Sequence, residues 1–420
     1  MNLLRKIGIG FFLTYFFLYL FPFPLNHVPF GIGGYISNWV ASFWETITPI
    51  FAKNIIGYQG ELSFSGRGSG DTTYDYLLAL LRFLIAFFLA LVFSFIRAHH
   101  FNSRRLFLLF LVILRYYLAY MMFVYGFSKI FYLQFPELSL INMTRTYGES
   151  SPMGLMWKFM GYSETYSIFT GLLELVGGLF LLSRYTKVLG GLLVFGIMFN
   201  VFMLNMSYDV PVKLFSFHLC LISLFILIPD FKSITDFFLL NRNTTSRPIR
   251  NYFENKYHNY IGYGLKFMFI FYITFNLIAS QLKTQKVHGK RVPESPLYGI
   301  YHIDSYQINK IVLPPLVTDT IRWRKLIVDK KTSLIIRMDG ERMAMKHVID
   351  TQKKTLELTP FLKKYPSYNF HYTDKDSVFL LNGISKADTL VIISKAKYGR
   401  DSFFLEKRGF NWINEYPVQR

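Results

Sequence analysis

The chain has 420 residues, of which 52% are hydrophobic, 19% aromatic and only 17% charged, and its formal net charge is +20. A soluble domain contains about 25% charged residues, so this composition argues against a wholly soluble protein. The positive charge does not indicate nucleic-acid binding, because no nucleic-acid motif accompanies it and basic loops are typical of membrane proteins. The single cysteine, Cys220, excludes an internal disulfide and a Cys-x-x-Cys redox pair.

The composition changes along the chain and predicts two domains. Residues up to about 282 form apolar blocks, a basic linker follows at 283–296, and residues 297–420 have soluble composition. A spanning helix needs about 20 apolar residues. The predicted spans are 7–25, 76–96, 106–133, 164–182, 188–206, 212–228 and 261–280. The fold class is therefore an α-helical membrane bundle of about seven spans with a C-terminal domain.

The first apolar segment, residues 7–25, has two interpretations. It could be a secretory signal peptide, but Pro22, Pro24 and His27 follow it in place of a small-residue cleavage site. We therefore expect a retained first helix.

The connecting loops indicate an orientation. With a cytoplasmic N-terminus, the inner segments contain about 12 basic residues, among them Arg5, Lys6 and the run at 97–105, against about 5 in the outer loops. This is the asymmetry that the positive-inside rule requires. An odd number of spans then places the C-terminal domain outside the cytoplasm, in a multi-pass protein of the cell (inner) membrane.

The first outer loop contains a second kind of helix. Apolar residues recur at intervals of three and four between Ile36 and Ile50, with Trp39 and Trp44 beside them. The pattern predicts an amphipathic helix at the membrane surface, with its indoles at headgroup depth; the alternative is an ordinary buried helix. The glycine-rich run at 66–71 lacks the features of a phosphate-binding loop and is interpreted as a flexible loop.

Period-two patterns dominate the C-terminal domain. Turn signals such as Asp339-Gly340 and Asn382-Gly383 separate short strands, which indicates a small antiparallel barrel or sandwich. The predicted strands are 323–328, 333–338, 355–358, 377–381, 390–394 and 403–407.

Ionisable residues within the spans are the candidate site, because a charge at the bilayer centre costs about 2.5–3.5 kcal/mol and needs a partner. We expect Arg115 to pair with Glu174, and Arg115 and Lys129 to share one helix face, with Arg82 near the level of Lys129. An outward-facing cavity could be lined by further polar residues, namely Asn200, Asn205, Asp209, Lys213 and His218. The alternative is a purely structural ion pair, with Arg82 and Lys129 extending to the headgroups.

A metal site is not predicted. His218 and Cys220 are two residues apart and cannot share a helix face, and His99 and His100 are adjacent in a basic loop.

Two of these segments resemble the DoxX/DoxD family of membrane proteins. Residues 115–129 are similar to a family helix that opens with arginine and ends Gly-x-x-Lys, and Glu174-Leu-Val-Gly-Gly178 is similar to its Glu-x-x-Gly-Gly run. The resemblance covers residues 115–229 and implies that Arg115, Lys129 and Glu174 are polar core residues. Some relatives are subunits of a thiosulfate:quinone oxidoreductase, so a quinone is the cofactor it implies. The sequence departs from sulfur-transfer chemistry, because its one cysteine lies in a predicted span.

Three functions remain open. The first is an accessory or scaffold protein whose outer domain binds a partner protein or lipid, favoured by a tethered domain without a catalytic motif. The second is a subunit of a quinone-linked oxidoreductase acting on a small anion. The third is a small-solute transporter, for which the expected inverted repeats are not seen.

Overall fold

The computed structural model describes residues 3–64, 68–95, 103–244, 256–375 and 378–418. The chain forms two compact units. The helical unit comprises Met1–Phe135 and Ser163–Thr284, and the β unit comprises Pro136–Tyr162 and Gln285–Arg420. The β unit is therefore built from two separate stretches of chain, whereas the sequence analysis assigned only 297–420 to it.

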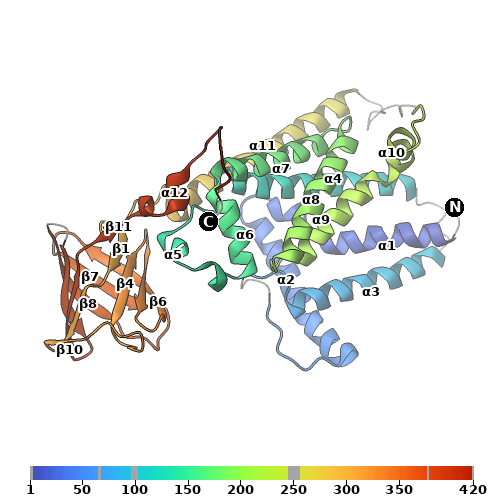
Figure 1. Ribbon diagram of the computed structural model, residues 1–420. Helices are drawn as coiled ribbons and strands as arrows, with labels where there is room; N and C mark the ends of the chain where they lie inside the picture. The colour runs from blue at the N-terminus through green and yellow to red at the C-terminus, as the bar shows by residue number, and fades with distance from the viewer. Residues whose placement is uncertain (1–2, 65–67, 96–102, 245–255, 376–377, 419–420) are drawn as a thin grey trace. The chain divides into compact units, whose positions relative to one another are not determined.

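Seven long apolar helices form the helical unit, as predicted (Figure 1). Each has the length and hydropathy needed to cross a bilayer, which indicates a membrane protein. The fourth has its predicted bounds, whereas the last is longer at both ends and leads into the β unit. They are α1 (Leu3–Leu20), α3 (Thr73–Phe95), α4 (Ser103–Ile130), α7 (Glu164–Leu182), α8 (Lys187–Ser207), α9 (Lys213–Leu227) and α11 (Lys256–His288). The shorter elements between them are η1 (Leu25–His27), α2 (Ile32–Phe51), η2 (Ala52–Ile56), η4 (Ile228–Asp230) and α10 (Phe231–Phe238).

Helices α4 and α7 make the most extensive helix pair, and glycines fix how they meet. A Cβ added at Gly126 would lie 2.9 Å from the Gly171 carbonyl oxygen, and one added at Gly171 would lie 2.7 Å from the Gly126 carbonyl oxygen. Only glycine allows this backbone approach, which is the usual way for apolar helices to pack closely in a membrane. The contact sets the register of the two helices.

Helix α2 is the amphipathic helix that the apolar spacing between Ile36 and Ile50 predicts. Its buried face, including Val40 and Trp44, packs against Tyr74 and Leu78 of α3. Trp39 on the other face is 67% exposed. Trp44 fills the contact with α3, and the position of the two indoles at headgroup depth stays a prediction.

The β unit contains one eleven-stranded antiparallel sheet that curves into a half-barrel (Figure 1). Its strands, in sheet order, are β11 (Lys397–Tyr398), β1 (Gly299–His302), β4 (Trp323–Val328), β5 (Thr332–Arg337), β6 (Arg342–Asp350), β7 (Thr355–Pro360), β8 (Tyr368–Lys375), β9 (Val378–Ser385), β10 (Asp388–Ser394), β2 (Ser305–Ile308) and β3 (Ile311–Val312). Strands β1 and β2 follow each other directly in the chain. The first pairs with β4 and the second with β10, so one segment joins distant parts of the sheet.

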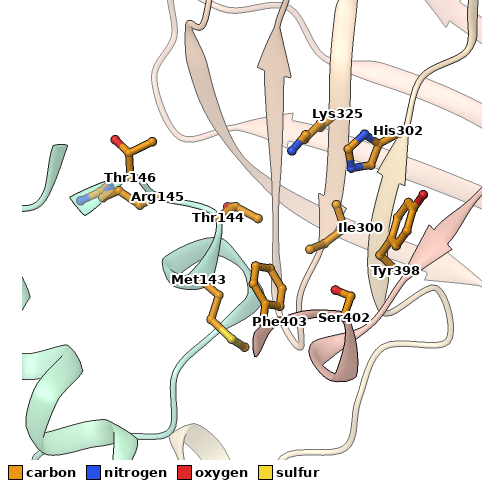
Figure 2. A pocket seen from close by; sticks show the side chains of 10 residues that line it. All are labelled: Met143, Thr144, Arg145, Thr146, Ile300, His302, Lys325, Tyr398, Ser402 and Phe403. Atoms are coloured by element: carbon orange, nitrogen blue, oxygen red, sulfur yellow. The ribbon is translucent and has the colours of Figure 1, made fainter. Parts of the chain in front are cut away.

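The segment between α4 and α7 belongs to the β unit and covers part of the sheet's outer face. It contains α5 (Leu140–Met143), η3 (Tyr147–Glu149) and α6 (Pro152–Tyr162). Leu140 is fully buried among Ile300, Ile327, Leu334 and Ile336 of strands β1, β4 and β5, and Met143 lies nearby (Figure 2). Burial of these aliphatic side chains attaches the segment to the sheet.

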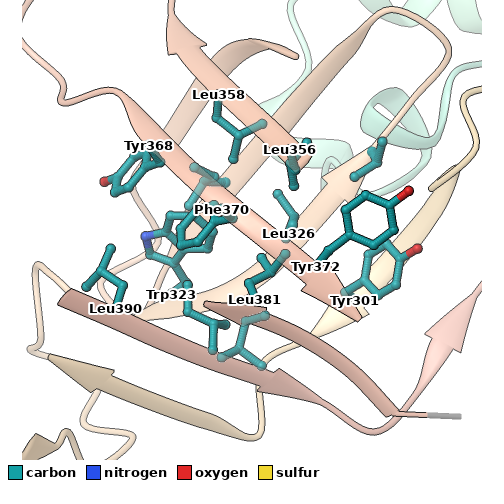
Figure 3. Packing of buried hydrophobic residues seen from close by; sticks show 14 of the residues in the cluster. Tyr301, Trp323, Leu326, Leu356, Leu358, Tyr368, Phe370, Tyr372, Leu381 and Leu390 are labelled. Atoms are coloured by element: carbon teal, nitrogen blue, oxygen red, sulfur yellow. The ribbon is translucent and has the colours of Figure 1, made fainter. Parts of the chain in front are cut away.

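The inner face of the sheet holds the main core (Figure 3). Tyr301, Tyr306, Trp323 and Phe370 are almost completely buried there. Large aromatic rings fill this interior, and their apolar burial supplies most of the driving force for folding the unit. Binding surfaces are therefore to be sought on the outside of the sheet.

Two local predictions in this domain are wrong. Residues 403–407 were expected to be a strand but form α12 (Phe404–Arg408), after the turn η5 (Arg400–Ser402). Asn382-Gly383 was expected to be a turn but lies inside β9. A Cβ at Gly383 would meet the Asn369 carbonyl oxygen at 2.0 Å, so this glycine serves a close strand contact.

Candidate functional site

Lys129 and Glu174 form the central ion pair of the helical unit. The Lys129 Nζ atom lies 2.5 Å from the Glu174 Oε1 atom, and both side chains are almost completely buried. The other carboxylate oxygen, Oε2, has no hydrogen-bond partner among the described residues. Such a pair is stable only because each charge compensates the other in a medium of low polarity.

This pairing corrects the predicted contact between Arg115 and Glu174. The Arg115 Nε and Nη2 atoms donate instead to the Leu181 carbonyl oxygen, at 2.9 and 2.8 Å. Leu181 lies two turns beyond Glu174 on α7, roughly 10 Å along the axis. The register set by Gly126 and Gly171 thus brings Lys129, and not Arg115, to the carboxylate. Both cations do reach α7, as expected for two residues on one face of α4.

Arg115 acts at the C-terminus of α7. The last carbonyls of a helix lack partners within it and carry partial negative charge. Arg115 satisfies the Leu181 carbonyl, and the Lys266 Nζ atom of α11 donates to the Leu182 carbonyl oxygen at 2.5 Å. Two cations from different helices therefore cap the end of α7.

Arg82 packs against aromatic rings. Its guanidinium carbon lies 5.0 Å from the Trp44 ring centroid and 5.9 Å from the Tyr19 ring centroid. Cation–π contacts of this kind stabilise a charge where water is excluded. Arg82 therefore joins α1, α2 and α3, and it is not a direct neighbour of the Lys129–Glu174 pair.

His218 lies in the same aromatic region. Its ring stacks on Tyr19 with the centroids 4.2 Å apart, its Nε2 atom lies 2.6 Å from the Tyr15 hydroxyl, and its Nδ1 atom lies 2.6 Å from the Leu214 carbonyl oxygen. Because a carbonyl only accepts, Nδ1 carries the proton and Nε2 accepts from Tyr15. The neutral ring thus has both nitrogens satisfied.

The other residues of the predicted cavity lie at separate places. Asn200 is exposed on α8, while the Asn205 amide donates to the Ser216 hydroxyl at 3.0 Å. Asp209, whose side chain is 83% exposed, pairs with Lys213 at 2.8 Å. The described residues contain no group of three potential metal ligands, and His99 and His100 lie outside the described residues.

Asp71 is a structural residue that the sequence analysis missed. Its carboxylate accepts hydrogen bonds from the backbone N–H groups of Lys213 and Leu214, at 2.7 and 2.9 Å, and so caps the N-terminus of α9. The predicted flexible loop at 66–71 therefore ends in an ordered contact, although residues 66 and 67 lie outside the described residues. An aspartate that caps a helix 142 residues further along the chain leaves no local signal in the sequence.

An open pocket of about 370 Å³ lies in the β unit, between the chain that follows α5 and the outer face of β1 and β4 (Figure 2). Met143, Ile300 and Phe403 form an apolar part of its lining. Lys325 and His302, from neighbouring strands, supply the basic part together with Arg145. None of these residues is predicted from the sequence, because the pocket requires two distant stretches of chain.

Basic side chains form a row across the sheet beside this pocket. In the strand register His302 is opposite Lys325, Lys325 is opposite Ile336, and Ile336 is opposite Arg342. The Arg342 Nη2 atom lies 3.4 Å from the Thr144 hydroxyl, which lines the pocket. Arg342 thereby holds the 136–162 segment, since it also donates to the Ile141 carbonyl oxygen at 3.3 Å. Lys325 and Arg342 are like charges on one face of the sheet, and such charges repel one another.

The charges in this row perturb one another. Burial, together with the nearby Arg324 and Arg342, lowers the pKa of Lys325. Burial, with Lys325 and Arg324 adding to it, also lowers the pKa of His302. Within the described part of the chain, the Lys325 ammonium has no ion pair or hydrogen bond. It is an unneutralised cation in the lining of a pocket that is partly polar and partly apolar.

The comparisons with known proteins give one partial match. A stretch of 99 residues is 31% identical to a Bacillus subtilis (strain 168) protein named uncharacterized protein YwoB, and the match covers 24% of this chain and 62% of that protein. The chain thus spans less than two thirds of that relative's length. No family model and no solved structure matches the chain. The DoxX/DoxD resemblance stays a prediction.

Proposed function

We propose that this chain is a multi-pass protein of the cell membrane that carries the β unit outside the cytoplasm, where that unit binds a partner protein or a lipid. In this proposal the protein has an accessory or scaffolding role and binds its partner through the β unit. The observation that carries it is that the charged side chains of the candidate site contact groups of the helical unit itself: Lys129 contacts Glu174, Arg115 a helix end, and Arg82 two rings, although Glu174 Oε2 and Arg82 Nε have no hydrogen-bond partner among the described residues. Such contacts stabilise a bundle, whereas the β unit keeps an unneutralised cation at an open pocket.

The connectivity of the β unit supports the proposed orientation. Its two stretches leave the helical unit after α4 and within α11. If α7, α8, α9 and α11 all cross the bilayer, the start of α7 and the end of α11 lie on the same side. The two stretches can then form one unit without either crossing the membrane. The basic inner loops favour the outer side for that unit.

Helix α2 supports attachment to the membrane surface. Tyr35, Trp39 and Phe43 are exposed, at 78%, 67% and 44%, on a helix whose other face packs on α3. Aromatic side chains of this kind favour the interface between headgroups and acyl chains. We propose that this exposed face lies in the outer interface.

Photo-crosslinking in cells tests the proposed binding role. A photoreactive phenylalanine analogue replaces Val348 or Tyr398, both exposed on the β unit, and in a control it replaces the exposed Phe88 of α3. We expect protein or headgroup adducts that form at the β-unit positions and do not form at Phe88, where acyl-chain adducts are expected. A chain that yields no adduct from either β-unit position would contradict the proposal.

The stacked Arg82, Tyr19 and His218 favour a second candidate, a subunit of a quinone-linked oxidoreductase. Aromatic rings beside a cation are a suitable surface for a quinone ring. The test compares quinone reduction by membranes with and without the chain, using thiosulfate, the donor implied by the DoxX/DoxD resemblance. Equal rates remove this candidate. A rate that depends on the chain and falls in Arg82→Gln would replace the accessory role.

A further inference from the structure

We propose that the pocket between the 143–146 segment and strands β1 and β4 binds a phosphate group carried by a partly apolar molecule. The inference rests on the proposed function, which makes the β unit the binding part of the protein, and it names the chemistry of the ligand. Lys325 is the central binding residue, with His302 and Arg342 on either side of it in the strand register.

The charge distribution points to an anion. Lys325 is half-buried and lacks an internal counterion, and Arg324 and Arg342 are close enough to act on it electrostatically. The acidic groups near the row lie at its ends: Glu149 acts on Arg342, and Asp304 acts on His302. An ammonium that is desolvated beside other cations is relieved when a ligand brings negative charge to it.

The strand geometry creates this concentration of charge. The pairing of β4 with β5 shifts register between Trp323 and Lys325, which marks a bulge at Arg324. In a regular strand, only one of two successive residues faces outward. Here Arg324 and Lys325 both lie outside the core, whereas Trp323 and Leu326 on either side of them are fully buried. Bulges re-aim side chains in this way and are frequent beside binding sites.

The shape of the pocket indicates more than a bare anion. Its volume of about 370 Å³ falls within the range of roughly 300–1,000 Å³ that small-molecule sites occupy. Met143, Ile300 and Phe403 offer apolar surface beside the basic side chains (Figure 2). The Thr144 and Ser402 hydroxyls already donate to the Ile141 and Gly399 carbonyl oxygens, so the donors for a ligand come from the basic side chains. The Lys325 ammonium has three donor protons and the Arg145 guanidinium, also in the lining, adds more, which suits the three or four oxygens of a phosphate ester better than the two of a carboxylate.

Two sources could supply this chemistry, a lipid headgroup or a free phosphorylated compound, and binding measurements separate them. The full chain in neutral detergent is titrated with inorganic phosphate and with dihexanoyl phosphatidylglycerol below its micelle concentration. We expect saturable binding of both that weakens about tenfold or more in Lys325→Gln, because a charge-assisted hydrogen bond is lost. The control is Lys346→Gln. It removes an exposed lysine of β6, on the same outer face of the sheet as Lys325, and is expected to leave binding unchanged.

The same variants give a second readout that a purely structural lysine would not show. Without ligand, Lys325→Gln removes a mutually repelling charge, so its unfolding midpoint is expected to rise by roughly 2 °C or more. Lys346→Gln, whose lysine lies over the Phe361 ring, gains nothing. Tighter binding of the short-chain lipid than of phosphate assigns the site to headgroups, and equal binding assigns it to free phosphate compounds.

Binding that is absent in both titrations, or equal in Lys325→Gln and the unaltered chain, overturns the inference. The proposed function is tested separately. Crosslinked adducts from Val348 that persist in Lys325→Gln would leave the binding role of the β unit intact while the phosphate site fails.

Discussion

Lys129 and Glu174 show what a buried charge requires of its neighbours. The two side chains come from α4 and α7, and each is almost completely shielded from solvent. The attraction between them is needed to offset the cost of taking both charges out of water. The two residues therefore depend on each other much more than either depends on its apolar surroundings.

Replacement of one partner is expected to destabilise the protein more than replacement of both. Glu174→Gln leaves the Lys129 ammonium buried without a counterion, which costs about 3–5 kcal/mol. The double variant Lys129→Met/Glu174→Leu should recover most of that loss. Thermal unfolding in detergent measures both. The surface control, Asp209→Asn, breaks the exposed contact with Lys213 and should cost about 1 kcal/mol or less. A double variant as unstable as the single one would contradict this account.

The sequence identifies charged residues of the bundle but not their partners. Hydropathy is enough to locate Arg82, Arg115, Lys129 and Glu174 within spans. The partners depend on helix register: on α7, two turns separate Glu174, the predicted partner of Arg115, from Leu181, its observed partner. That register comes from a glycine contact between two helices, which no single helix encodes.

At the scale of elements, the contact of Gly126 with Gly171 decides how α4 and α7 pack. Gly126→Ala would place its Cβ 2.9 Å from both the Gly171 carbonyl oxygen and Leu175, and the helices must separate to admit it. We expect a loss of about 1–3 kcal/mol in unfolding free energy, the usual cost of overpacking. The matched control is Gly196→Ala on α8, whose Cβ would meet nothing within 4 Å. A Gly126→Ala variant as stable as Gly196→Ala would show that the close approach is dispensable.

Strand prediction succeeded where β-branched and aromatic residues alternate, as in β4, whose predicted and observed bounds agree. It missed β6, although its burial alternates and Met343 and Met345 point into the core. Methionine is not among the β-branched and aromatic residues that are enriched in strands, so the alternation gives a weak strand signal. The strand predicted at 403–407 is wrong for another reason: this stretch forms α12, and Arg400 of the preceding turn η5 pairs with Glu406 at 2.7 Å. Contacts with neighbouring residues therefore decide the conformation of 403–407 more than its short sequence pattern does.

At the scale of the molecule, the orientation of the chain can be measured by thiol labelling. Cys220 is buried, so Cys220→Ser provides a background without reactive thiols. We expect Glu149→Cys and Lys353→Cys, both exposed in the β unit, to react with an impermeant maleimide in spheroplasts. Asn243→Cys, between α10 and α11, should react only after permeabilisation. Labelling of Asn243→Cys in intact spheroplasts, or of Glu149→Cys and Lys353→Cys from opposite sides, would contradict the proposed orientation.

The split origin of the β unit imposes an order on its biosynthesis. Residues 136–162 leave the ribosome long before Ile300, Ile327 and Leu334, the side chains that later cover Leu140. During that interval the aliphatic side chains around Leu140 are exposed to water or lie against the bilayer. A nascent chain that stops short of β5 would keep the patch uncovered, and quality-control proteases could recognise it as unfinished.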